Sequence, residues 1–112
     1  SYSVGNFEEA IDFYRKAIEN SSSKQAVFFQ FRIAECFQEA FRLDEAIQEY
    51  LKVSYFYPQN KSLCAKALLR IAQIYEDRED IQSAKSIYQK ILQMDVQEAK
   101  YAKERLDLLG LQ

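Results

Sequence analysis

The chemistry open to this chain is limited first by a side chain that it lacks. Its 112 residues contain no histidine, so the commonest general base and the commonest ligand of catalytic zinc are both missing. The neighbouring carboxylates Glu8/Glu9 and Glu76/Asp77 suit acid–base work in type, but nothing beside them predicts the shifted pKa that such work needs. We therefore expect no catalytic site, no metal and no cofactor, and a protein that is not an enzyme.

Aromatic and basic side chains instead predict a surface that binds another protein. Phe28, Phe31 and Glu35 lie three or four residues apart, so a helix would place them on one face. The phenylalanines would form an apolar floor and arginines a charged anchor. The candidate contact residues, which include matching positions further along the chain, are Phe28, Phe31, Arg32, Glu35, Lys66, Leu69, Arg70 and Gln73. An alternative is that Phe28 and Phe31 pack beneath a neighbouring helix.

Composition narrows the class of fold and of partner. The chain has two Gly and one Pro, too few for the regularly spaced turns of an all-β protein. The 15 basic and 17 acidic residues are mixed, with a net charge of −2, so no basic patch predicts a nucleic-acid partner. No apolar run reaches the roughly 18 residues of a membrane span. Cys36 and Cys64 are expected to fill core space as small apolar side chains.

Internal repeats organise the sequence. Ala10, Ala46 and Ala84 recur at nearly equal intervals, and each is followed four residues later by a tyrosine. The segment that begins at Ile33-Ala34 and ends at Phe37 recurs at nearly the same interval as Ile71-Ala72 and Tyr75. Such a period predicts stacked helix pairs, none of which can bury its apolar face alone.

Apolar residues three or four apart predict six helices. The first starts after Asn6, which with Glu9 forms a capping-box pattern. Pro58 and Asn60 break the helical pattern between the third and fourth helices. Gly110 follows the last apolar residues and is expected to end the last helix. The expected helices span about 7–19, 24–39, 44–57, 61–77, 80–94 and 97–109.

The repeat resembles the tetratricopeptide (TPR) family, whose 34-residue unit reads W-x₂-L-G-x₂-Y, A-x₃-F, then P. One unit matches as Gln30-x₂-Ile33-Ala34-x₂-Phe37, Ala46-x₃-Tyr50 and Pro58, and the next as Leu68-x₂-Ile71-Ala72-x₂-Tyr75, Ala84-x₃-Tyr88 and Val96. Tyr57-Pro58-x-Asn60 and the closing Ala99-x-x-Ala102-x-x-Arg105 look most like bacterial cell-envelope TPR proteins, of the outer-membrane assembly lipoprotein or Tol–Pal coordinator type.

The resemblance implies an all-α, right-handed solenoid of antiparallel helix pairs with about two and a half repeats. Residues 1–20 would be the second half of a truncated repeat, 24–58 and 61–96 full repeats, and 97–109 a capping helix. It implies a scaffold that binds a peptide or protein on its concave face, or a structural segment of a longer solenoid. Lys66 and Arg70 resemble two members of the basic clamp by which some chaperone-binding TPR proteins hold a carboxylate.

The N-terminal edge raises the question of self-association. The apolar stripe Phe7, Ile11, Tyr14 and Ile18 would pack partly on the helix expected at 24–39 and partly on a missing helix, and leaving several such side chains exposed is unfavourable. We therefore expect this edge to be covered by a further helix or by a second copy in a homodimer. The envelope likeness and the two thiols together leave bacterial cytoplasm and periplasm both open.

Overall fold

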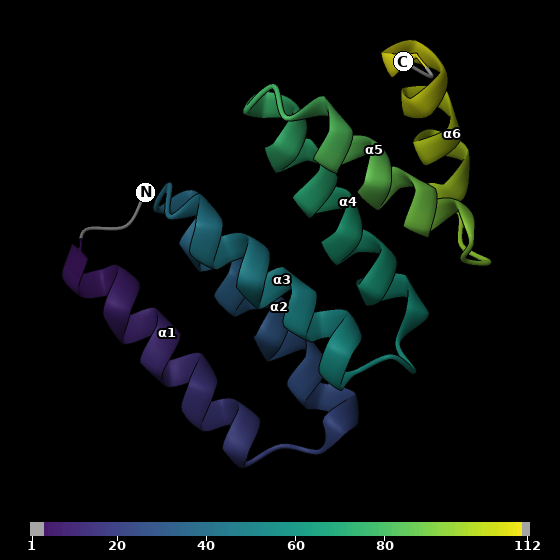
Figure 1. Ribbon diagram of the computed structural model, residues 1–112. Helices are drawn as coiled ribbons and strands as arrows, with labels where there is room; N and C mark the ends of the chain where they lie inside the picture. Colours follow the sequence, from purple (N-terminus) through teal and green to yellow (C-terminus); the bar gives the residue numbers. More distant parts are fainter. Residues whose placement is uncertain (1–3, 111–112) are drawn as a thin grey trace.

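The computed structural model describes residues 4–110, which form a chain of helices with no strand among them (Figure 1). In order these are α1 (Val4–Glu19), α2 (Ser23–Glu39), α3 (Leu43–Phe56), α4 (Lys61–Asp77), α5 (Ile81–Leu92) and α6 (Glu98–Leu109). Each packs on the next, and the pairs α2–α3 and α4–α5 repeat one another along the chain. The prediction of an all-α helical repeat is confirmed.

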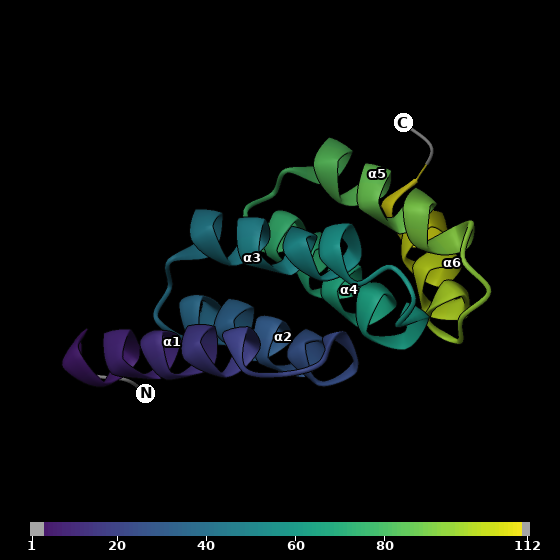
Figure 2. The same ribbon diagram turned by 90° about the horizontal axis from the view of Figure 1, so that it is seen from below.

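The helices form two layers with unequal spacing. Figure 2 shows α3 and α5 on one side, and α2 and α4 on the other. Within the described residues α2 approaches α4 and α4 approaches α6, whereas α1, α3 and α5 do not approach one another. The layer that contains α2, α4 and α6 is therefore the inner one, and we call its solvent-facing surface the inner face. No helix of the described part is long and apolar enough to cross a bilayer.

The repeated Ala–Tyr pairs lie at the centre of each hairpin. Ala46, Tyr50, Ala84 and Tyr88 are all 0% exposed. The small alanines let two helices approach closely, while the tyrosine rings fill the space one turn further on. The repeat register read from the sequence therefore places its most regular residues in the core.

The stripe on α1 is already covered within the chain. Phe7 and Ile11 are buried, and the Phe7 ring meets Phe37 edge-on with ring centroids 5.1 Å apart. Tyr14 and Ile18 are partly buried against the same core. The expectation that this stripe needs a second cover is therefore wrong for Phe7 and Ile11, which are buried within the chain. Among the side chains of α1 whose burial is described, from Asn6 on, the large apolar one that is exposed is Phe13, which lies outside the stripe.

Helix starts agree with the sequence except at the first one. The Asn60 side chain caps α4 by accepting from the Leu63 amide at 3.0 Å, and Asp80 caps α5 in the same way through Ser83. Asn6, by contrast, lies inside α1, which begins at Val4. The predicted capping box at Asn6 is therefore wrong, since the helix continues through it.

The turns that join α2 to α3 and α4 to α5 have the same backbone conformation. Phe41 and Glu79, at equivalent places in consecutive repeats, have φ values of 60° and 61°. After each helix the next two amides bond back to it: Phe41 to the Gln38 carbonyl, and Arg42 to the Phe37 carbonyl at 2.9 Å. This is a Schellman motif, whose left-handed residue is usually glycine. Neither position has glycine, so each turn carries backbone strain.

Replacing the strained residue should therefore stabilise the protein. We expect Glu79→Gly to raise the free energy of unfolding by about 0.5–1 kcal/mol, because relief of the left-handed strain exceeds the extra freedom of glycine in the unfolded chain. Urea denaturation followed by circular dichroism measures this change. The control Gln89→Gly, in the ordinary helical backbone of α5, should lose about 1 kcal/mol. Equal losses in both variants would contradict the strain argument.

Candidate functional site

The predicted contact residues lie on two neighbouring helices of the inner layer. Four come from α2 and four from α4, and these two helices lie side by side. Phe28 is 55% exposed, and Lys66 is also exposed. Leu69 and Gln73 are half-buried between the surface and the core. The structure thus brings most of the predicted residues to one surface.

Three charged residues of this surface form a fixed cluster. The Glu35 carboxylate accepts from Arg32 Nη1 at 2.6 Å on its own helix and from Arg70 Nη1 at 3.0 Å across the gap to α4. Glu35 therefore holds both arginines and ties α2 to α4. The arginines were predicted as charged anchors for a partner, and each already has a carboxylate partner within the chain.

Phe31 is not part of an exposed floor. It is 8% exposed and packs edge-on against Tyr50, with ring centroids 5.4 Å apart. The Arg70 guanidinium lies 5.3 Å from its ring centroid and covers it from the solvent side. The prediction that Phe31 offers a binding surface is therefore wrong, because its position on α2 turns it toward α4 and α3. Phe28, one turn earlier, is the aromatic that remains accessible.

An arginine–tyrosine pairing joins consecutive repeats. Arg70 donates to the Tyr50 hydroxyl at 3.1 Å, and that hydroxyl donates to the Gln38 side chain. One repeat earlier, the Arg32 guanidinium lies 5.9 Å from the centroid of the Tyr14 ring.

One repeat later a carboxylate mediates the same junction: Glu76 accepts from the Tyr88 hydroxyl and from Arg105 Nε, the latter at 3.1 Å. Arg105 was not among the predicted site residues. The recurring tyrosines of the sequence were the signal that could have pointed to it.

These contacts set the protonation of the groups on the inner face. Burial raises the pKa of Tyr50 to about 12, although Arg70 acts in the opposite sense. Hydrogen bonds from Arg105, and to a smaller extent from Tyr88, hold the pKa of Glu76 below its usual range against the effect of burial. At neutral pH Tyr50 is therefore neutral and Glu76 is ionised.

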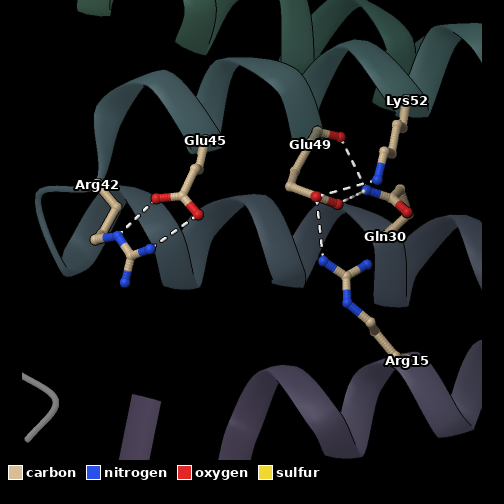
Figure 3. A network of polar contacts seen from close by, with 6 residues as sticks. All are labelled: Arg15, Gln30, Arg42, Glu45, Glu49 and Lys52. Carbon is tan, nitrogen blue, oxygen red and sulfur yellow. Dashed lines mark hydrogen bonds and ion pairs between the residues drawn. The ribbon is translucent and has the colours of Figure 1, made fainter. Parts of the chain in front are cut away.

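A second polar cluster lies between α1, α2 and α3 (Figure 3). Glu49 is 6% exposed, and its carboxylate accepts from Gln30 Nε2 at 2.9 Å and from Arg15 Nη2 at 3.1 Å. Lys52 adds a further ion pair at 3.1 Å. Burial alone would raise the pKa of Glu49, but these three donors outweigh it and the pKa is lowered. The Glu49 carboxylate therefore has a structural role: its oxygens are occupied by donors from α1, α2 and α3.

The same positions in the next repeat are apolar. Gln30 and Glu49 correspond to Leu68 and Ile87 one repeat further on, and both of these are buried. Gln30 occupies the tryptophan position of the TPR pattern. The structure shows that its side-chain amide donates to the Glu49 carbonyl oxygen as well as to its carboxylate.

A comparison with protein families bears on what such a stack is. The family model of soluble NSF attachment protein (SNAP) matches residues 1–104. The chain belongs to the SNAP family. No curated protein matches it in a sequence search. SNAP-family proteins are helical protein-interaction adaptors of TPR-like fold, and the match gives no support to the likeness with bacterial envelope proteins.

In this SNAP-family chain, the buried polar pair Gln30 and Glu49 should be replaceable by leucine and isoleucine, the residues at the same positions of the next repeat. Glu49→Ala alone should cost about 1–3 kcal/mol, because it removes the buried carboxylate acceptor and leaves the Gln30 amide with only the backbone carbonyl of residue 49. The double variant Gln30→Leu/Glu49→Ile should be close to neutral, since apolar residues of similar size can replace a buried polar pair. Urea midpoints measure both.

The reciprocal variant is the control for this exchange. Leu68→Gln/Ile87→Glu introduces the polar pair where the position matching Arg15 is Leu51, so no arginine can neutralise the new carboxylate. It should be strongly destabilising. A double variant at positions 30 and 49 as unstable as Glu49→Ala would contradict the interpretation.

Glu76 should make the stability of this SNAP-family chain depend on pH. Its lowered pKa means that the unfolded chain, with an ordinary glutamate pKa near 4.3, takes up the proton first on acidification. The stabilisation is complete above that value and is lost as pH falls through the lower folded pKa. Glu76→Gln should therefore cost about 1 kcal/mol at pH 7 and flatten the decline in urea midpoint below about pH 5. The exposed residue Glu104 provides a control, Glu104→Gln, that should change neither quantity. A full acid slope in Glu76→Gln would rule out this role.

Proposed function

We propose that this chain is an adaptor that holds a segment of a partner protein against the inner face, along α2 and α4. The observation that carries the proposal is the exposure of Phe28, at 55%, on a surface whose neighbouring charged side chains are fixed. A large exposed aromatic beside a rigid polar cluster has the character of a binding hot spot. The proposed contact residues are Phe28, Lys66, Leu69 and Gln73, with the Arg32–Glu35–Arg70 cluster as their support.

The rigidity of the cluster favours binding over catalysis. Arg32, Glu35 and Arg70 satisfy one another, so a partner meets a surface that needs little reordering, and less conformational entropy is lost on association. The same mutual pairing leaves no acid or base aimed at an open site, which supports a role without catalysis. Membership of a family of adaptor type is consistent with this proposal.

A second candidate role is that of a segment within a longer solenoid, with residues 24–58 and 61–96 as its full repeats. It is favoured by exposed apolar side chains near both ends of the stack, Phe13 at 66% on α1 and Leu108 at 75% on α6. In this role end-to-end stacking, including a homodimer through α1, would cover them. Sedimentation of Phe13→Ser and Leu108→Ser beside the parent chain tests it, since loss of a concentration-dependent oligomer in either variant would support this role. The bacterial envelope is one setting in which such a role would fit.

The binding role predicts that removal of the exposed ring abolishes recognition while the fold remains. Peptides selected from a phage-displayed library on the parent chain provide the probe, and fluorescence polarisation measures their affinity. We expect Phe28→Ala to weaken binding at least about tenfold, an effect typical of a hot-spot aromatic. Phe13→Ala removes a comparably exposed ring from α1 and should leave the affinity unchanged. Equal affinity for Phe28→Ala and the parent chain would sink the proposal for this face.

A further inference from the structure

A hollow at one end of the inner face is distinct from the arginine cluster. It has a volume of about 620 Å³ and lies between the start of α2, the end of α3 and the start of α4. This size falls within the range of about 300–1,000 Å³ that is typical of ligand pockets. The lining residues are Ser23, Lys24, Val27, Phe56, Tyr57, Gln59, Asn60, Lys61 and Ser62.

One wall of the hollow is apolar, and polar side chains line the rest. Val27, 1% exposed, is part of the core at its base, and Phe56 remains 58% exposed at its side. Tyr57, half-buried, continues the aromatic wall. A ring left this exposed beside a concavity can bury more of its surface only if another side chain enters. The hollow therefore fits one bulky apolar side chain.

The charge of the hollow has one sign. Lys24 and Lys61 line it, and none of its lining residues carries a carboxylate. Every arginine of the chain takes part in an ion pair, whereas Lys24 and Lys61 form none within the described residues. Lys24 and Lys61 can therefore still receive the carboxylates of a partner, and both lie at this hollow.

The placement of these lysines is unfavourable for the helices that contain them. Each lies in the first turn of its helix, and neither α2 nor α4 has an acidic residue there. The N-terminal end of a helix dipole is positive, so stability alone would favour aspartate or glutamate at such positions. The two helix starts and the two lysines add to one positive potential beside the aromatic wall of the hollow.

We propose that this hollow binds a short acidic segment of the partner protein, with one large apolar side chain inserted against Phe56 and the flanking carboxylates placed at Lys24 and Lys61. The proposal rests on the adaptor role above and specifies where on the inner face the acidic end of the bound segment lies. Charge complementarity chooses the occupant: a basic segment would be repelled, and a purely acidic one would leave the aromatic wall uncovered.

The test uses a synthetic acidic peptide with a central phenylalanine, and the same peptide with serine in place of phenylalanine or with lysines in place of the acidic residues. Fluorescence polarisation measures affinity, and ¹⁵N chemical-shift changes locate the site. We expect only the first peptide to bind, with shifts at Lys24, Val27 and Lys61. The affinity should weaken with added salt, because the Debye length falls from about 10 Å at 0.1 M to about 3 Å at 1 M.

Charge reversal provides the decisive variants. Lys24→Glu and Lys61→Glu should each weaken binding at least about tenfold. They place acidic residues where the helix dipole favours them, so unfolding cannot explain a loss. Lys100→Glu is the matched control: an exposed lysine in the first turn of α6, whose reversal should leave affinity within about twofold.

Several outcomes would overturn the proposal. These are no binding up to about 1 mM peptide, an equal loss in the Lys100→Glu control, equal binding of the serine peptide, or shifts confined to Arg32 and Arg70. The last result would leave the adaptor role intact while removing this site. Binding of phosphatidylserine vesicles, lost on reversal of Lys24 or Lys61 while the peptide fails to bind, would assign the hollow to an anionic membrane surface. Concentration-dependent self-association lost in the same variants would assign it to a second copy of this chain.

Discussion

A buried tyrosine hydroxyl needs hydrogen-bond partners, and this requirement joins the repeats. Tyr50 is completely buried as a residue, and its hydroxyl is reached by Gln38 of its own hairpin and Arg70 of the next. A phenylalanine there would fill the same space but would leave Arg70 without this acceptor. Because Arg70 also bonds Glu35, one phenolic oxygen fixes the relative position of α2, α3 and α4. The inner face inherits its shape from that junction.

The sequence predicted the fold well because the repeat signals act locally and agree with one another. The Ala–Tyr pairs four residues apart, the break at Asn60 and the helix stop at Gly110 each depend on neighbours within one or two turns. The capping pattern at Asn6 failed although it is present in the sequence, because α1 packs on α2 and its helix begins earlier, at Val4. Tertiary packing thus outweighed a local preference.

The site was harder to predict, because helical periodicity shows which residues share a face of a helix but not which neighbouring helix buries that face. Phe28 and Phe31 look equivalent in the sequence, and only the position of α4 decides that Arg70 covers one of them. Arg32 and Arg70 could be recognised because they occupy equivalent places in consecutive repeats. That Glu35 of α2 pairs with Arg70 of α4 depends on how the two helices pack, which the sequence does not give. Lys24 and Lys61 could not be brought together from the sequence, since the turn that joins α3 to α4 sets their relation.

The separation of the two kinds of cation has a consequence for how this surface can evolve. The arginines form ion pairs with neighbouring carboxylates. Replacing Arg70 or Arg105 would break an ion pair that joins two helices of the stack. The lysines at the helix starts support nothing, so they can be replaced without altering the architecture. Substitutions at these lysines can therefore change which partner is bound without changing the fold, so related chains can acquire new partners while keeping the same helical stack.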